Sequence, residues 1–402
     1  MTMMSNLPRD LVEEILSRLP LKSTRAMRLT CKNWNALSKS QSFTKIHIDK
    51  VAVTREEESQ MIVMMDNTVY LKSAVVNGIH VDLSKEPKGK LTCLDEQVKI
   101  SYFLHCEGLL LYVLGDDDSR LVVWNPYLGQ TRSITPRSYY HNREMYNAAN
   151  HFAWYEIYDF DSDSWTTLDV TPKWRISSCN RGVSLKGNTY WCARRHHSHY
   201  LICFDFTCER FGSLLHLPQT NCIGDSVNLS CVGEEKLAAL VQFTDSNKTE
   251  IWITTKIEAE EVSWSKFLTL DQGPVVYNPD LFINGSFLIN KEKKVTLVFD
   301  TNGFNRYTVF IVGETGYIRE VDFGEPEYRY YYSRHVSSYV PSLVQIKQPQ
   351  GGKRKRQSDL EMLRYDEKRL KLVALEKKTK KPFRGFRQKR RQIACMGSRR
   401  WR

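Results

Sequence analysis

Short apolar strands recur along most of the chain, and their regular spacing is the feature that most restricts the fold. Each copy is an apolar strand that runs into an Asn or Asp turn, and a return strand follows that often carries an aromatic residue. The copies align on five residues at intervals of 34, 46, 48 and 46: Trp124, Tyr158, Phe204, Trp252 and Val298. A period in the forties favours an all-β, propeller-like domain with about four strands in each blade.

A β-sandwich with accidental regularity is the alternative to a propeller. Turn residues at Gly187-Asn188 and at Gly233 support hairpins, which both folds need. The repeat itself favours the propeller, because a sandwich requires no period in the forties. We therefore predict an irregular, kelch-like propeller domain over residues 91–346, with residues 46–90 as connecting strands or as the first part of the β domain.

One interval of the repeat is shorter than its neighbours by about a dozen residues. It lies between Trp124 and Tyr158, where residues 139–150 are polar and rich in Asn and Tyr. The interval predicts one truncated blade after Pro136, with edge strands left exposed.

Residues 7–37 are rich in leucine and predict a helical hairpin. Leu11, Ile15 and Leu19 fall four residues apart on one helical stripe, and Pro20 ends that helix because proline cannot continue it. A second helical stretch follows. About forty residues of this kind cannot bury a sufficient core alone, so we expect the hairpin to complete its core on a partner.

The hairpin resembles an F-box over residues 7–20 and at Lys22, Ser23, Arg28, Leu29, Cys31, Lys32 and Trp34. Members of this family bind the Skp adaptor of a cullin-based (SCF) ubiquitin ligase, which also contains cullin and RING subunits. The resemblance places residues 1–45 in the F-box and implies an apolar adaptor-binding surface, formed by Leu7, Pro8, Leu11, Ile15, Leu16, Leu19 and Pro20, with Trp34 packing the later helix against the first. An ordinary amphipathic hairpin, with all these residues in its own core, is the alternative.

A second resemblance covers residues 103–131 and 181–206, which are similar to the opening and the middle of the plant type 1 F-box-associated domain. It implies a β domain that recruits a protein substrate, and a chain that serves as the non-catalytic substrate-recognition subunit of an SCF ubiquitin ligase. The chain departs from the family pattern after Pro136, where a strand hairpin of the family is missing. A decayed, non-functional family member therefore remains an alternative.

The positive charge of the chain is concentrated in a tail at residues 347–402. Residues 349–402 contain 20 Lys and Arg against 5 Asp and Glu, whereas residues 1–348 contain 38 basic and 41 acidic residues. A capping box at residues 358–361 and a partly apolar stripe at Leu360, Leu363, Leu370 and Val373 predict a helix within this tail. We expect the tail to be basic and partly helical or disordered.

Two basic sets in the tail predict nuclear import through a receptor that binds exposed Lys and Arg. The first is Lys353, Arg354, Lys355 and Arg356, and the second contains Lys389, Arg390 and Arg391. We expect the protein in the nucleus, the cytoplasm or both. The alternative is a nucleic-acid or chromatin-associated protein that uses the β domain as a scaffold and acts through its tail. The near-neutral body makes nucleic acid the weaker prediction.

Other chemistry finds little support in the sequence. Six residues are of the types that bind zinc, but their spacing fits no zinc motif, so we expect no metal and no cofactor: Cys192, His196, His197, His199, Cys203 and Cys208. Nucleophile elbows and phosphate-binding loops are missing, and no apolar run approaches the roughly 18 residues of a membrane span. A cluster at Tyr328, Tyr330, Tyr331 and Tyr332 predicts the last strand of the β domain or, alternatively, a contact with a substrate.

Overall fold

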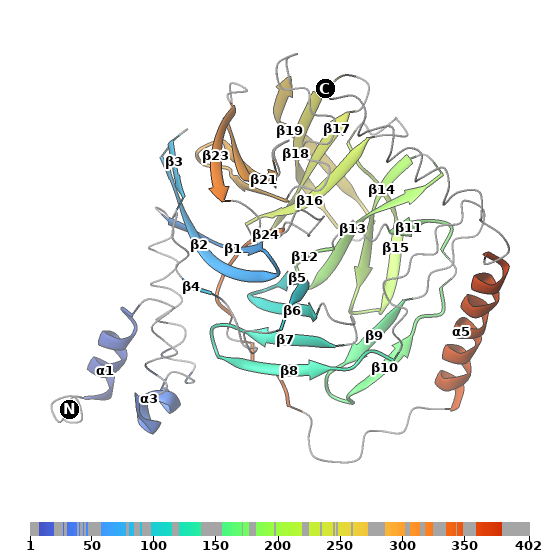
Figure 1. The fold of residues 1–402 in the computed structure, drawn as a ribbon, viewed down its shortest axis with the longest axis horizontal. Helices are drawn as coiled ribbons and strands as arrows, with labels where there is room; N and C mark the ends of the chain where they lie inside the picture. Colours follow the sequence, from blue (N-terminus) through green and yellow to red (C-terminus); the bar gives the residue numbers. More distant parts are fainter. Residues whose placement is uncertain are drawn as a thin grey trace, which may run out of the picture. The chain divides into compact units, whose positions relative to one another are not determined.

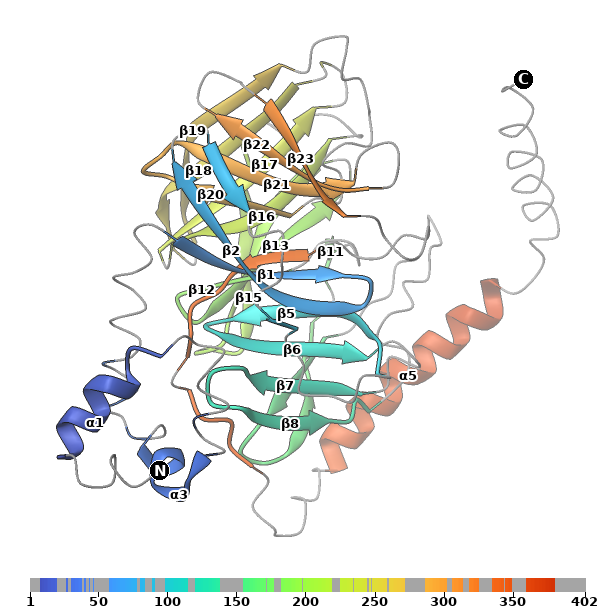
Figure 2. The ribbon, with the colours of Figure 1, turned by 60° about the vertical axis from the view of Figure 1, so that its left-hand side comes forward.

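A computed structural model of the 402-residue chain divides into two compact units (Figures 1 and 2). The first contains residues 1–139 and 176–348, and the second contains residues 140–175 and 349–402. The structure describes residues 8–19, 27, 30–37, 40, 43, 46, 58–77, 80–83, 89–90, 98–114, 120–137, 155–170, 172–176, 182–196, 198–218, 225–233, 235–243, 246, 248–258, 260–271, 286–301, 306–313, 318–324, 335–342, 344–348 and 359–379.

Two short helices, α1 (Arg9–Leu16) and α3 (Lys32–Leu37), are described near the N-terminus. α1 ends earlier than the predicted stop at Pro20. The hydroxyl of Ser17 donates to the carbonyl oxygen of Glu14 at 2.8 Å, and the next two amides bond three residues back instead of four. This tighter geometry closes the helix before proline is reached.

Five antiparallel sheets of four or five strands form the blades of a propeller, which confirms the predicted fold class. The first blade contains β24 (His335–Ser338), β1 (Glu58–Met65), β2 (Thr68–Asn77) and β3 (His80–Leu83), with β4 (Gly89–Lys90) beside β2. The second contains β5 (Ile100–Cys106), β6 (Leu109–Leu114), β7 (Leu121–Asn125) and β8 (Gln130–Ile134). The third contains β11 (Arg175–Ile176), β12 (Val183–Leu185), β13 (Asn188–Arg195), β14 (Ser198–Asp205) and β15 (Arg210–His216). The fourth contains β16 (Ser226–Val232), β17 (Lys236–Phe243), β18 (Lys248–Ile257) and β19 (Val262–Asp271), and the fifth β20 (Ser286–Asn290), β21 (Val295–Thr301), β22 (Tyr307–Gly313) and β23 (Ile318–Gly324).

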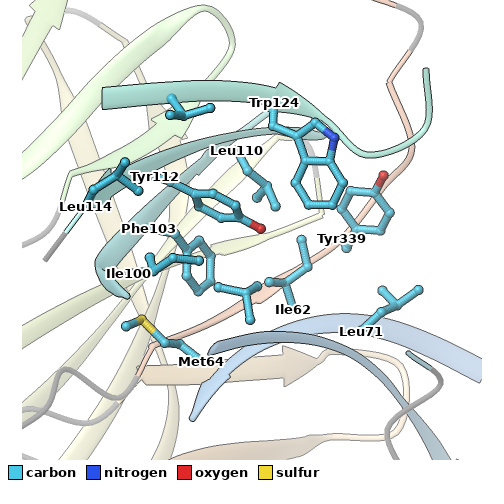
Figure 3. Close-up of a cluster of buried hydrophobic side chains, with 12 residues drawn as sticks. Ile62, Met64, Leu71, Ile100, Phe103, Leu110, Tyr112, Leu114, Trp124 and Tyr339 are labelled. Atoms are coloured by element: carbon cyan, nitrogen blue, oxygen red, sulfur yellow. The ribbon is translucent and has the colours of Figure 1, made fainter. Parts of the chain in front are cut away.

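The blades are buried on both faces, which explains their long apolar runs. In β1, Met61 and Val63 pack toward the fifth blade, whereas the alternate residues Ile62 and Met64 pack toward the second. Figure 3 shows the latter cluster. Because successive side chains of a strand point to opposite faces, a strand covered on both sides reads as continuously apolar and not as alternating.

The first blade is completed by the far end of the propeller sequence. β24 pairs antiparallel with β1, and His335 lies opposite Met64 at one end of the register. Sequence analysis predicted strands at residues 46–90 but not this closure. Pairing an N-terminal strand with a C-terminal one closes the ring, so that neither end of the propeller is left as an open sheet.

A ring of side-chain hydrogen bonds joins the innermost strands β24, β5, β12, β16 and β20, each of which lies next to the following one. Each neighbouring pair has one such bond: Ser337 Oγ to His105 Nδ1 (3.0 Å), Cys106 Sγ to Ser184 Oγ (3.0 Å), Cys231 Sγ to the carbonyl oxygen of Ser184 (3.2 Å), Ser230 Oγ to the carbonyl oxygen of Phe287 (2.7 Å), and Ser286 Oγ to His335 Nδ1 (3.2 Å). Short polar side chains therefore link the blades where the strands converge.

His105 is held as a neutral imidazole in this ring. Its Nε2 accepts the amide hydrogen of Gly108 at 3.1 Å, so Nδ1 carries the proton and donates to Ser337. Burial lowers the pKa of His105 to about 4. An unfolded chain binds this proton near pH 6.5, so between these values the unfolded state binds more protons than the folded one.

Stability is therefore expected to fall as the pH drops from 6.5 toward 4, and this histidine contributes roughly 3 kcal/mol to that loss. Replacing His105 with asparagine should remove most of this histidine's contribution to the change in unfolding free energy with pH. Denaturant unfolding at pH 7 and pH 4.5 measures it. His196→Asn is the matched control, because that residue is exposed at a turn whose positive φ of 54° asparagine tolerates. Equal pH slopes for wild type and His105→Asn would contradict this assignment.

Three of the five aligned residues of the repeat lie in equivalent strands, and Tyr158 lies in none of the five blades. Trp124, Phe204 and Trp252 occupy the third strand of their blades, counted from the inner edge, whereas Val298 lies in β21, the second strand of the fifth blade. The alignment at Val298 was therefore shifted by one strand. The apolar residues of β21 are buried on both faces of the blade. Its sequence is therefore a continuous apolar run, like that of the third strand in other blades.

The second unit contains the segment in which a truncated blade was predicted. Its described strands are β9 (Glu156–Asp159) and β10 (Ser164–Thr167), which form a two-stranded sheet, and its helix is α5 (Asp359–Thr379). Tyr158 and Trp165 lie opposite each other in this hairpin, with ring centroids 5.1 Å apart. Where the other sheets have at least four strands, the described residues here supply two.

Candidate functional site

The N-terminal helices have a small core of their own. Leu16, Met27, Leu37 and Phe43 are buried together, and three partly buried residues pack against them: Val12, Leu19 and Trp34. The amide of Trp34 also donates to the sulfur of Cys31 at 3.4 Å, at the start of α3. Trp34 thus packs α3 against the same core as α1.

A second apolar face of α1 points away from this core. Leu11 is 50% exposed and Ile15 is 41% exposed, one helical turn apart, whereas Leu16 is 3% exposed. Pro8, at the start of the helix, is also exposed. At this spacing the two exposed side chains are neighbours on the surface of the helix.

The predicted adaptor-binding residues are therefore divided between two environments. Leu11 and Ile15 lie on the exposed face, and Leu16 and Leu19 belong to the core of the hairpin. Leu7 and Pro20 lie outside the described residues, as do the two basic sets of the tail and the tyrosines at 328–332. Of the predicted adaptor-binding residues that the structure describes, Pro8, Leu11 and Ile15 are exposed on one face of α1. We call this the α1 face.

A polar site in the second blade was missed by sequence reasoning. Asn125 is fully buried, and its Nδ2 donates to the carbonyl oxygens of Ser342 and Val344 at 3.0 and 2.8 Å. Its Oδ1 accepts the amide hydrogen of Leu128 at 2.9 Å. In the sequence Asn125 reads only as a turn residue. The structure shows that it also holds residues 339–342 and 344–348, which follow β24 and which we call the C-terminal strap.

Further contacts fix the C-terminal strap on the second blade. The guanidinium of Arg132 donates to the carbonyl oxygen of Lys347 at 2.6 Å, and Tyr339 is buried beside Trp124 (Figure 3). Gly108, at a positive φ of 77°, allows the strap to approach closely, because a Cβ there would stand 2.3 Å from the carbonyl oxygen of Val340. The strap thus anchors the end of the propeller sequence to its second blade.

Two of the candidate zinc ligands in the third blade serve its packing. Cys192 and Cys203 are buried in the cluster between the third and fourth blades. Burial raises the pKa of Cys192 to about 12, which is opposite to the lowered pKa of a reactive thiol. Burial also lowers the pKa of His199, and the nearby Arg194 lowers it further. Among the residues that the structure describes, no cluster of three or more His, Cys, Asp or Glu could hold a metal ion.

The described helices range from 6 to 21 residues in length. None of them is both long and apolar enough to cross a bilayer.

Two family models match the chain. The F-box domain matches residues 4–46, and the F-box associated beta propeller domain matches residues 60–346. The second match covers more than half of the chain, including all five blades.

Curated relatives match along nearly the whole length. An F-box/kelch-repeat protein from Arabidopsis thaliana is 51% identical over 413 residues, which cover 91% of this chain and 95% of that protein. An F-box protein from the same plant is 50% identical over 424 residues, covering 94% of this chain and 98% of that protein. A third Arabidopsis thaliana relative, named Peroxiredoxin-2A, is 47% identical over 401 residues that cover 89% of this chain and 71% of that protein.

Proposed function

Because the chain belongs to the family of F-box proteins that carry an F-box associated β-propeller domain, we propose that it is the substrate-recognition subunit of an SCF ubiquitin ligase. F-box domains bind Skp-type adaptors, and the α1 face carries this proposal for the present chain. Leu11 and Ile15 are exposed although the hairpin has its own core, so they are available to a partner.

The division of α1 into two faces suggests that different residues of this helix serve folding and adaptor binding. The inner face, with Val12 and Leu16, stabilises the hairpin, while Leu11 and Ile15 contribute apolar area only when the adaptor covers them. We place the adaptor-binding region within residues 1–45, target recruitment within residues 46–346, and a separate role in the tail at residues 347–402.

In this proposal the chain accelerates ubiquitin transfer by positioning. The adaptor links the F-box to cullin and RING subunits, while the propeller holds a protein target near the ubiquitin-charged enzyme, which raises the effective concentration of the target. A closed ring of blades with linked inner strands suits this role, because a rigid scaffold keeps the target at a fixed position.

Reconstitution tests the proposal. The purified full chain is mixed with a Skp-type adaptor, and then with cullin and RING subunits, and the products are separated by size-exclusion chromatography with light scattering. We expect a stable complex with one copy of the adaptor for each chain, and a larger one with all four components. Failure of the folded chain to retain the adaptor would contradict the proposal.

We further propose nuclear import through the two basic sets of the tail. The support is the sequence: Lys353, Arg354, Lys355 and Arg356 follow a Gly-Gly pair, and residues 1–348 hold slightly more acidic than basic residues. Changing these four residues to alanine in a fluorescent fusion is expected to lower the nuclear-to-cytoplasmic ratio several-fold. Lys291→Ala with Lys294→Ala is the control, because it removes exposed charges from a blade turn. A fusion truncated after Gln348 that remained nuclear would rule out an import role for the tail.

A further inference from the structure

Polar side chains of helix α5 are buried in the second unit. The carboxylate of Glu361 accepts the amide hydrogen of Thr167 at 2.8 Å, on strand β10. Glu361 is 9% exposed and Lys368 is 7% exposed, and these residues lie seven apart on one side of the helix.

Three leucines of α5 are exposed. Leu360, Leu363 and Leu370 are 71%, 65% and 68% exposed, and they lie three and seven residues apart, which places them on one helical stripe. Single exposed leucines are normal on protein surfaces, but three on one stripe of an anchored helix form a contact surface. We call this the α5 stripe.

The charge distribution along α5 indicates what covers the stripe. Residues 359–367 contain four acidic residues and one basic residue, a net charge of −3, whereas residues 368–379 contain five basic residues and one acidic residue, a net charge of +4. Two copies of this helix placed antiparallel bring the acidic half of each beside the basic half of the other. A parallel pair would place like charges together.

We propose that α5 is a self-association element, and that the α5 stripe binds the same stripe of a second copy of the chain in antiparallel orientation. Leu360 of one copy then lies near Leu370 of the other. Glu367, which is part of the same side of the helix, is already paired with Lys371 at 2.5 Å and needs no further partner. The helix is short, so the contact area is small and the dimer is weak and salt-sensitive.

Sedimentation velocity of the full chain over a range of concentrations tests this proposal. Leu363→Lys is expected to raise the dissociation constant of the dimer at least about tenfold, because it puts a charge in the stripe. Met362→Lys is the matched control: the residue is adjacent and 49% exposed, but lies about 100° away around the helix, so its substitution should change the constant by less than about twofold. Circular dichroism confirms that both variants retain their helix.

Zero-length cross-linking with a carbodiimide tests the orientation. Asp359 and Lys371 lie opposite each other when Leu360 of one copy is near Leu370 of the other, but they are about 18 Å apart along one helix, because each residue rises about 1.5 Å. A cross-link between these two residues therefore joins two antiparallel copies. The proposal is overturned if the chain is monomeric at every concentration, if the dimer is unchanged by Leu363→Lys, or if the dimer forms without the Asp359–Lys371 cross-link.

Discussion

Changing Leu11 and Ile15 to alanine together is expected to abolish binding of a Skp-type adaptor while the chain remains folded. The two side chains are about half exposed, at 50% and 41%, so the free chain loses little when they are shortened. The complex loses two apolar contacts that would be covered by the adaptor. At roughly 2 kcal/mol for each contact, affinity should fall by about a thousandfold. Calorimetric titration of the adaptor into the full chain measures this.

Two controls separate a binding defect from a folding defect. Phe206→Ala removes a large apolar side chain that is 49% exposed in the third blade, and it should leave adaptor binding unchanged. Leu16→Ala removes a buried side chain and should destabilise the N-terminal hairpin by about 2–5 kcal/mol. Adaptor affinity equal to wild type in the Leu11/Ile15 variant would show that the α1 face is not the binding surface.

Replacing Asn125 with alanine is expected to destabilise the propeller by at least about 3 kcal/mol. The substitution leaves three backbone groups without their side-chain partner: the carbonyl oxygens of Ser342 and Val344, and the amide of Leu128. Two of these bonds hold the C-terminal strap, so hydrogen exchange of residues 344–348 should also become faster. Urea unfolding and hydrogen-exchange mass spectrometry measure the two effects.

Asn290 provides the matched control for Asn125. It stands at the end of β20, as Asn125 stands at the end of β7, and its Oδ1 accepts the amide hydrogen of the residue three positions on, Lys293, at 3.0 Å. No hydrogen bond to the strap is described for it. Asn290→Ala should therefore cost about 1 kcal/mol and leave the strap protected. Equal losses in the two variants would mean that Asn125 acts as a turn residue and not as an anchor.

The propeller was predictable because equivalent positions in successive blades pack alike and therefore carry similar apolar residues. Trp124, Phe204 and Trp252 recur at the same strand of successive blades. The closure of the ring was not predictable in the same way. β24 is a strand of four residues, His335–Ser338, and its partner β1 lies more than 260 residues earlier, so no local pattern connects them. Long-range pairing of this kind depends on the whole ring and not on local periodicity.

The F-box was predictable as a motif, but its division into two faces was not. Leu11 and Ile15 lie on α1 next to Val12 and Leu16, and an apolar stripe of more than 100° includes both pairs. Periodicity identifies such a stripe without saying which part of it is covered. That information comes from the positions of Met27, Leu37 and Phe43, which bury one part and leave the other exposed.

Hydrogen exchange of the full chain, with and without a Skp-type adaptor, tests the central claim most directly. We predict that adaptor binding slows exchange in α1, Arg9–Leu16, and leaves the innermost strands of the five blades unchanged. This pattern would place the adaptor on the α1 face and leave the propeller available for a target. Protection confined to the blades, or no protection at a saturating concentration of adaptor, would contradict the account.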